Sequence, residues 1–322
     1  MRAVYAESIN PEDPLTGLVV GERPEPTPDD GWTRVAVKAA SLNHHDLWTL
    51  RGVGIKKDQL PMILGCDAAG IDESTGDEVV VHSVINVDGW RGDDTLDPGR
   101  TLLSEKHQGS LAEYVVVPRR NVVPKPSELS WGEAACLSTA WLTAYRMLFT
   151  QARVQPGQTV LVQGASGGVA TACISMARAA GLRVYATART EDKQARAREL
   201  GAHDAFASGA RLPERVDAVM ETVGEATWSH SLKSLKPGGV IVVSGATSGA
   251  APSAELNRVF FLQLRVLGST MGTKAELGDL ISFLQVTGLR PLIDRELPME
   301  KAADGLAAMA SGDLVGKIVL TV

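Results

Sequence analysis

The chain has only three cysteines, Cys66, Cys136 and Cys173, and they lie far apart in the sequence. So few and widely spaced thiols give no disulfide framework, which is typical of the reducing cytoplasm. No apolar run approaches the roughly 18 residues that suggest a membrane span. Residues 1–5 indicate the start of a strand rather than a signal peptide. The sequence therefore predicts a cytoplasmic protein with no membrane partner.

The chain also lacks a long basic run, and its formal net charge is −6. Nucleic acid is not expected as a partner, because its phosphates are bound mainly through clustered lysines and arginines. Neither an internal repeat nor a low-complexity tract is present. The composition is otherwise ordinary for a globular protein, and 322 residues are enough for two domains with substantial cores.

The stretch that organises the chain is TVLVQGASGGVA at 159–170: a short apolar run, a glycine-rich turn, and small residues that open a helix. The β-branched apolar residues before the turn predict a buried parallel strand. Gly164, Gly167 and Gly168 have no Cβ, so backbone N–H groups can approach a pyrophosphate at a helix N-terminus. Because Ala165 stands where the full dinucleotide pattern has a glycine, the turn alone fits any α/β protein equally well.

Strand and helix patterns alternate after this turn. The predicted helices cover 169–180, 191–200 and 226–235, the strands cover 182–188, the region near 205, 216–222, 240–244 and 265–268, and a turn covers 236–239. Short apolar strands that alternate with helices of about ten residues predict a doubly wound parallel sheet. This part of the chain is therefore predicted to be a Rossmann domain.

The end of the second predicted strand indicates the cofactor. An NAD site usually places Asp or Glu about 20 residues after the glycines, whereas NADP sites use basic and hydroxyl side chains for the 2′-phosphate. No acid stands at the strand tip, and Thr187, Arg189 and Lys193 are within reach. We therefore predict NADPH. The alternative is that Arg189 and Lys193 belong only to a solvated loop and helix start.

Short apolar segments separated by Pro, Gly and Asp clusters predict a compact all-β unit near the N-terminus. These segments are 18–20, 34–39, 78–83 and 112–117, and a polar stretch at 85–107 is expected to be a surface loop. Helical patterns at 275–287 and 299–311 precede a final strand at 317–322, which would most easily complete the N-terminal β unit. The predicted domains are therefore 1–123 with 270–322, and 124–269.

Six ordered landmarks resemble the medium-chain dehydrogenase/reductase superfamily. They are SLNHHDLWTLRG at 41–52, ILGCDAAG at 63–70, GDEVV at 76–80, GSLAEYV at 109–115, TAY at 143–145 and GASGG at 164–168. The resemblance implies an α/β protein with a GroES-like β domain, a Rossmann domain, and an active site between them. It is closest to the zinc-free quinone oxidoreductase and enoyl reductase branches.

Some members of the superfamily bind a catalytic zinc and others do not. The zinc alcohol dehydrogenases hold it through Cys, His and Cys. The resemblance places these ligand positions on Asn43, Cys66 and Thr139, and the region of the structural zinc lobe has no cysteine. In extended chain, the adjacent His44 and His45 would point to opposite faces, so at most one could share a site with Cys66. We therefore expect no metal, and Cys66 is expected to be a small buried hydrophobe.

Without a metal to polarise a carbonyl, the hydride acceptor should already be electrophilic. This favours a small quinone, enone or enal, to which hydride from NADPH adds conjugatively. An enoyl thioester of CoA or a carrier protein is the alternative substrate. From another functional class, the chain could be a low-turnover NADPH-binding sensor or structural protein.

The resemblance gives three candidate catalytic residues. Asn43 lies near the nicotinamide and substrate in quinone oxidoreductases and could donate a hydrogen bond to a developing oxyanion, although a turn or capping role fits equally well. His45 stands where zinc alcohol dehydrogenases keep a hydroxyl proton relay and could supply the final proton, or it could be a satisfied core group. Asp46 is expected to orient its neighbours by hydrogen bonds.

The expected cofactor contacts combine the glycine turn, the end of the second strand and positions implied by the resemblance. They are Thr143, Gly164, Ala165, Ser166, Gly167, Gly168, Val169, Thr187, Arg189, Lys193, Thr222, Val223, Gly245, Ala246, Thr247, Leu267, Ser269 and Met271. The strand pair near Val240 and Val266 lies where relatives extend their sheets across a two-fold interface. By that analogy a homodimer is expected.

Overall fold

The computed structural model describes all 322 residues, which form two compact units. The first unit combines Met1–Leu142 with Met271–Val322, and the second is Thr143–Thr270. None of the helices is both long and apolar enough to cross a bilayer.

The first unit is built mainly from short strands. They are β1 (Arg2–Ala6), β2 (Leu18–Glu22), β3 (Trp32–Ser41), β4 (Met62–Ile63), β5 (Ala69–Asp72), β6 (Glu78–Val81), β7 (Val84–Ile85), β8 (Thr101–Leu102), β9 (Tyr114–Pro118), β10 (Val122–Pro124), β17 (Ile293–Pro298) and β18 (Lys317–Thr321). The largest sheet has the order β10-β6-β5-β3-β18-β17, with β9 also paired to β3. Alternate residues of β3, such as Val35 and Val37, are buried in the core, as period-two patterning requires.

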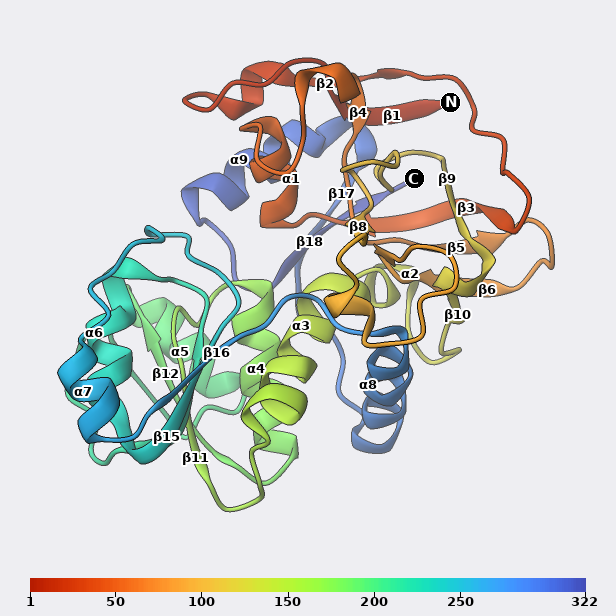
Figure 1. Cartoon of the computed structure of the whole chain (residues 1–322). Helices are drawn as coiled ribbons and strands as arrows, with labels where there is room; N and C mark the ends of the chain where they lie inside the picture. The colour runs from red at the N-terminus through yellow and green to blue at the C-terminus, as the bar shows by residue number, and fades with distance from the viewer. The chain divides into compact units, whose positions relative to one another are not determined.

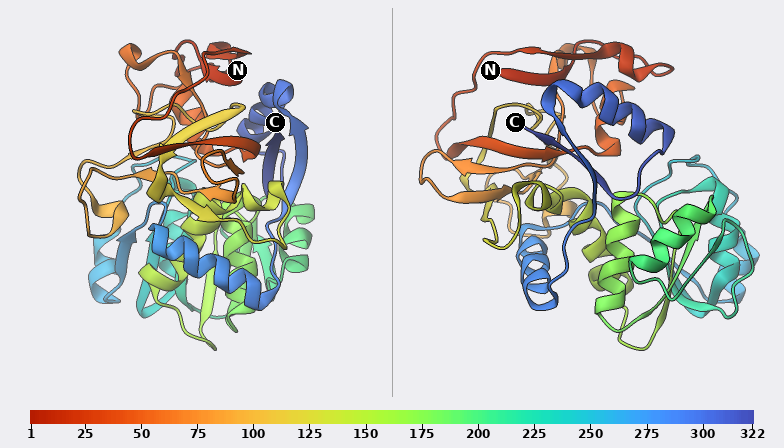
Figure 2. Two further views of the ribbon diagram at one scale, coloured as in Figure 1. Left: turned by 90° about the vertical axis from the view of Figure 1, so that its right-hand side faces the viewer. Right: turned by 180° about the vertical axis from the view of Figure 1, so that it is seen from behind.

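The α-helices of this unit are α1 (His44–Leu50), α2 (Trp131–Ala134), α8 (Lys274–Thr287) and α9 (Ala302–Ser311). The C-terminal strand β18 pairs antiparallel with β3, so the end of the chain completes the N-terminal β unit (Figure 1). Both termini therefore belong to the same unit and lie near each other (Figure 2).

The second unit is a parallel sheet with the order β13-β12-β11-β14-β15-β16. Its strands are β11 (Thr159–Val162), β12 (Arg183–Ala188), β13 (Asp204–Ala207), β14 (Val216–Glu221), β15 (Leu235–Val243) and β16 (Arg265–Gly268). Its helices are α3 (Leu142–Tyr145, which starts at the unit boundary), α4 (Gly168–Ala179), α5 (Glu191–Glu199), α6 (Glu225–Ser234) and α7 (Leu256–Phe261). Helix α4 covers one face of the sheet and α6 the other, which confirms the Rossmann fold (Figure 1).

Three differences from the sequence prediction concern the unit boundary, residues 236–239 and helix α7. The unit boundary falls after Leu142 rather than after residue 123, because α2 packs against β3 and β5 of the first unit. The predicted turn at 236–239 lies within β15, where the pairing with β14 shifts register and Gly238 has φ of +75°. Helix α7 was not predicted, because its six residues are too few to show a helical period.

Candidate active site

Helix α1 begins beside the predicted catalytic residues. Asn43 is its N-cap residue, and its backbone N–H donates to Asp46 Oδ2 at 2.8 Å. The other oxygen of Asp46 accepts the N–H of Gly65 at 2.9 Å. Asp46 is fully buried, and this burial raises its pKa to about 6 against the opposing effect of these two hydrogen bonds. Asp46 thus ties the start of α1 to the turn at Gly65.

The side-chain amide of Asn43 is committed to protein partners. Its Nδ2 donates to Asp67 Oδ2 at 2.8 Å and to the carbonyl of Ser41 at 3.1 Å. Its Oδ1 accepts a hydrogen bond from Lys317 Nζ at 2.6 Å. Both amide hydrogens and the amide oxygen are therefore engaged by protein partners.

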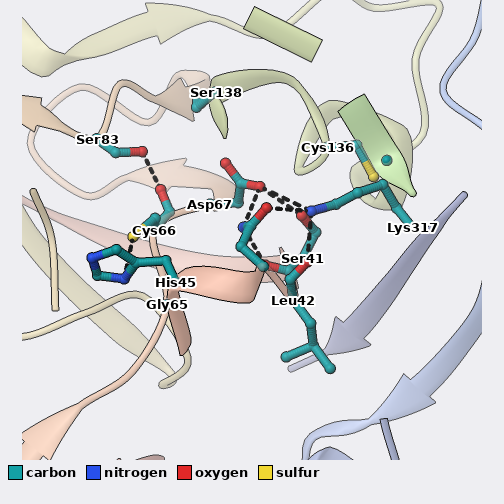
Figure 3. A network of polar contacts seen from close by, with 12 residues as sticks. Ser41, Leu42, His45, Gly65, Cys66, Asp67, Ser83, Cys136, Ser138 and Lys317 are labelled. Carbon is teal, nitrogen blue, oxygen red and sulfur yellow. Dashed lines mark hydrogen bonds and ion pairs between the residues drawn. The ribbon is translucent and has the colours of Figure 1, made fainter. Parts of the chain in front are cut away.

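Lys317 is a site residue that the sequence analysis missed. Its side chain is 4 % exposed and runs from β18 to the end of β3, where Nζ also donates to the carbonyl of Leu42 at 2.6 Å (Figure 3). Nζ lies 3.6 Å from Oδ2 of the fully buried Asp67. The signal for this role was a single charged residue at the start of an otherwise apolar final strand.

His45 connects two ionisable side chains. Its Nδ1 lies 3.2 Å from Cys66 Sγ, and its Nε2 lies 3.3 Å from Glu105 Oε1. The Cys66 thiol donates to the carbonyl of Leu103 at 3.3 Å. Its sulfur can therefore accept a hydrogen bond from His45 Nδ1, a contact that Figure 3 shows. Burial alone would lower the pKa of His45, but Cys66, Glu105 and Asp46 outweigh it and raise that pKa well above its usual value. The Glu105 carboxylate at Nε2 thus favours the protonated form of His45.

Glu105 was also missed, because it lies in the stretch 85–107 that was expected to be only a surface loop. Its Oε2 accepts the N–H of Leu102 at 2.9 Å and the hydroxyl of Thr101 at 3.1 Å. Burial raises the pKa of Glu105, but its hydrogen bonds to His45 and to this turn lower it overall. The carboxylate is thus fixed in place and charged beside His45.

His44 takes no part in this cluster, since it is exposed on α1. The two histidines stand on the first turn of a helix rather than in extended chain, so the reason given for separating them was wrong. Only His45 contacts Cys66, as expected for at most one of the pair. Cys66 is fully buried, as predicted, and burial raises the pKa of its thiol.

The glycine turn lies between β11 and α4 in the second unit. Gly164 has φ of +69°, and a Cβ there would stand 2.7 Å from Val223 Cγ2. Gly167 is the N-cap of α4, and the space around its Cβ position is open. Ala165 and Ser166 complete the turn, and Gly168 and Val169 begin the helix. The first N–H groups of a twelve-residue helix thus face the turn, which fits an anionic pyrophosphate.

The three residues predicted to bind the 2′-phosphate have different surroundings at the end of β12. Thr187 is fully buried; its hydroxyl donates to Gln163 Oε1 at 2.5 Å and accepts the N–H of Gly164 at 3.4 Å. Its side chain is therefore turned into the protein, contrary to the expected ligand contact. Arg189 is exposed directly after β12, and Lys193 lies in the first turn of α5.

Most other predicted cofactor residues of the second unit lie at the same edge of the sheet, since the carboxyl ends of parallel strands meet there. Thr222 and Val223 follow β14, the 245–247 loop (Gly245, Ala246 and Thr247) follows β15, and Leu267 and Ser269 lie at the end of β16. Thr143 begins the second unit within α3, and Met271 begins the C-terminal part of the first unit.

Comparison with known proteins identifies the family. The model of the alcohol dehydrogenase GroES-like domain matches residues 29–127, and the model of the zinc-binding dehydrogenase matches residues 168–286. Mouse quinone oxidoreductase is 30% identical over 316 residues, which cover 92% of this chain and 90% of the mouse protein. The chain belongs to the medium-chain dehydrogenase/reductase superfamily. It is a quinone oxidoreductase-like member, and its GroES-like and Rossmann units are those that the sequence predicted.

Two further relatives with different described activities are also similar to this chain. Crotonyl-CoA carboxylase/reductase of Cereibacter sphaeroides is 29% identical and covers 83% of this chain and 75% of its own length. The crystal structure of an NAD-dependent alcohol dehydrogenase superposes with a TM-score of 0.92 at 34% identity, covering all of both chains. The chain is accordingly an oxidoreductase of a superfamily that binds nicotinamide cofactors.

The residues of this member do not fit the catalytic zinc that the second family name implies. At the three ligand positions, the amide of Asn43 is saturated by protein partners, and Thr139 supplies only a hydroxyl. Cys66 and Glu105 contact opposite nitrogens of His45 and so cannot converge on one ion. No three His, Cys, Asp or Glu side chains gather in a way that could hold a metal. We derive no chemical step through zinc.

Proposed function

We propose that this medium-chain reductase transfers hydride from NADPH to a quinone or to the activated C=C bond of an enone or enal, without zinc. The observation that carries the proposal is the network of Lys317, Asn43 and Asp67 at the zinc-ligand region. The Asn43 amide and the Lys317 ammonium are engaged within this network, so neither supplies a ligand for a Lewis acid that would polarise an unactivated carbonyl. An acceptor that delocalises the incoming charge over a conjugated system has less need of one.

The second unit would hold the cofactor, which when bound supplies the hydride. The turn from Gly164 to Gly168 binds the pyrophosphate through backbone N–H groups. Arg189 and Lys193 face the ribose 2′-phosphate, and no acid at the tip of β12 repels it. Thr187 is not part of this contact, because its hydroxyl supports the glycine turn instead.

His45 is the proton donor in this proposal. Hydride addition to an enone or quinone leaves an enolate or phenolate, which needs one proton to give the neutral product. Contact with the Glu105 carboxylate favours the charged form of His45, which carries the proton to be given. Transfer leaves neutral imidazole, which takes a proton back from solvent after the turnover.

The cofactor choice is tested by titrating the protein with NADPH and NADH. We expect NADPH to bind more tightly, and the double variant Arg189→Ala/Lys193→Ala to remove most of that preference. Equal affinity of the unmodified protein for both cofactors would contradict the proposal. This test is needed because one structural relative is described as NAD-dependent.

The substrate class is tested with a panel of quinones, enones, enals and crotonyl-CoA, by following NADPH absorbance. We expect turnover with quinones or with enones and enals. Preference for crotonyl-CoA would favour the second candidate, an enoyl-thioester reductase, which the crotonyl-CoA carboxylase/reductase relative supports. Tight NADPH binding without oxidation by any acceptor would favour a sensor or structural protein. Elemental analysis with one zinc per chain would overturn the argument from the network.

A homodimer completes the proposal. Strand β16 is the edge of the parallel sheet, and Val266 on it is exposed. The neighbouring α7 also exposes Leu256, Phe260 and Phe261, the last at 80%. Unpaired edges and exposed large apolar side chains mark association surfaces. We expect a dimer in sedimentation equilibrium, and Phe261→Asp to yield monomer; a monomeric parent protein would refute this.

A location in the cytoplasm is proposed from the free, buried thiols alone.

A further inference from the structure

Three neighbouring strands of the second unit end in buried polar side chains. Thr187 lies near the end of β12, Gln163 follows β11 directly, and Glu221 is the last residue of β14. All three are fully buried, and their strands are adjacent in the sheet order β12-β11-β14. Buried polar groups are costly unless they are hydrogen-bonded, so their partners show what they do there.

The first link joins β12 to the glycine turn. The hydroxyl of Thr187 donates to Gln163 Oε1 at 2.5 Å and accepts the N–H of Gly164 at 3.4 Å. The carbonyl of Thr187 also accepts the N–H of Ala165 at 2.8 Å. The backbone of the turn is thus set by the end of the adjacent strand.

The second link joins Gln163 to β14 through α6. Gln163 Nε2 donates to Ser231 Oγ at 2.9 Å and lies 2.9 Å from His230 Nδ1. His230 Nε2 lies 2.8 Å from the carbonyl of Ala210, to which it donates when the ring is neutral and Nδ1 accepts. Every hydrogen-bonding group of the Gln163 amide then has a partner. Ser231 passes the connection on, because its hydroxyl donates to Glu221 Oε2 at 2.6 Å.

The third link holds the turn after β14. Glu221 Oε1 accepts the N–H groups of Val223 at 2.8 Å and Gly224 at 3.0 Å. The hydroxyl of Thr227 lies 2.9 Å from both carboxylate oxygens. No basic side chain pairs with Glu221, so these donors alone compensate its burial. The turn that they fix also lies against the glycine turn, since a Cβ on Gly164 would meet the side chain of Val223.

We propose that Glu221 and Gln163 are positioning residues for the cofactor. One buried chain of hydrogen bonds runs from Gly164 through Thr187, Gln163, Ser231 and Glu221 to the backbone of Val223 and Gly224, and sets the spacing of the two turns. This rests on the proposed NADPH function, in which the first turn holds the pyrophosphate. The resemblance to medium-chain reductases implies that the second turn, at Thr222 and Val223, contacts the nicotinamide. The chain therefore positions the nicotinamide half of the cofactor relative to its phosphates.

Ser231→Ala is the main test, because it cuts the chain in the middle while removing one atom. We expect the Kd for NADPH to rise at least about fivefold, because the variant loses two hydrogen bonds of the chain and one alone corresponds to about that factor. Adenosine 2′,5′-bisphosphate carries the 2′-phosphate but no nicotinamide, so its Kd should change less than about twofold on the same reasoning. Thr187→Val should weaken the binding of both ligands. Its matched control is Thr159→Val, because Thr159 is also a buried threonine but lies at the opposite end of β11.

Glu221 is tested with two variants. Glu221→Leu removes the acceptor of the Val223 and Gly224 N–H groups, and we expect it to weaken the binding of NADPH more than tenfold. Glu221→Gln keeps one acceptor oxygen for them and should restore most of the affinity. Hydrogen exchange over residues 222–225 without cofactor should quicken in the Leu variant and remain slow in the Gln variant. This readout checks the link even if the Leu variant is too unstable for titration.

The outcomes separate the two proposals. If the unmodified protein binds NADPH and Ser231→Ala binds it as well as the Thr159→Val control does, the positioning role is overturned. Equal weakening of NADPH and the bisphosphate in Ser231→Ala would show a general loss of structure and would also overturn it. If the unmodified protein binds neither NADPH nor NADH, the proposed function itself fails, whatever the variants do.

Discussion

Replacing Lys317 with methionine is expected to destabilise the first unit strongly. The ammonium group donates to the carbonyl of Leu42 and to Asn43 Oδ1 at 2.6 Å each, and it faces the fully buried Asp67 at 3.6 Å. Methionine fills a similar volume but donates nothing. It leaves two buried acceptors unpaired and a buried carboxylate without a counter-charge.

The size of the effect follows from these contacts. Removing one member of a buried charge pair costs about 3–5 kcal/mol, and the separation of 3.6 Å places Lys317→Met near the lower end of that range. For a unit of this size, each kcal/mol lowers Tm by about 2–4 °C. We therefore expect the Tm of this unit to fall by roughly 6–12 °C.

Differential scanning calorimetry measures the change, with Lys301→Met as the matched control. Lys301 is exposed and forms a surface ion pair with Asp304 at 3.5 Å, so its loss should cost less than about 1 kcal/mol. Lys317→Met combined with Asp67→Asn removes both charges and should recover part of the loss. If Lys317→Met costs no more than Lys301→Met, or if the double variant recovers nothing, the reasoning about the buried pair is refuted.

Two further predictions concern the turn and the histidine. Gly164→Ala should weaken the binding of NADPH at least tenfold in a fluorescence titration, because φ is +69° and the new Cβ would meet Val223. The control is Gly181→Ala, since Gly181 also has a positive φ but follows the end of α4. The control variant should lose a similar amount of stability and keep its affinity for NADPH. Glu105→Gln should lower the pKa of His45. Since that pKa is raised in the folded protein, the pair stabilises the fold fully below about pH 6.5 and loses this contribution as pH rises through the folded value. Urea unfolding from pH 6 to 9 should therefore show a smaller fall in stability for the variant than for the parent, and parallel curves would count against the pair.

Local patterns in the sequence were sufficient for the architecture. The glycines after an apolar run predicted the turn at 164–168, where Gly164 has the positive φ that residues without a Cβ adopt freely. Alternating helix and strand patterns predicted the parallel sheet, and an apolar final segment predicted that β18 would join the N-terminal unit. These features depend on neighbours within a few residues, so the sequence carries them directly.

The direction of Thr187 could not be predicted in this way. Strand β12 is buried along most of its length, with helices on both faces of the sheet, so alternation does not separate inward from outward side chains. Thr187 therefore looked as available to a phosphate as Arg189. Its hydroxyl instead supports the glycine turn, and only the packed position of Gln163 decides this.

The sequence by itself determined two units, a glycine turn ready for a pyrophosphate, and the loss of the zinc-ligand residue types. Tertiary structure alone decided which partners the site residues have. Lys317 bonds to Asn43 across 274 positions of the chain, and Glu105 reaches His45 across 60. Such pairs depend on strand register and loop path, where a shift of one residue turns a side chain to the opposite face. No local pattern encodes that choice, so the buried network of Lys317, Asn43 and Asp67 becomes visible only when the chain is folded.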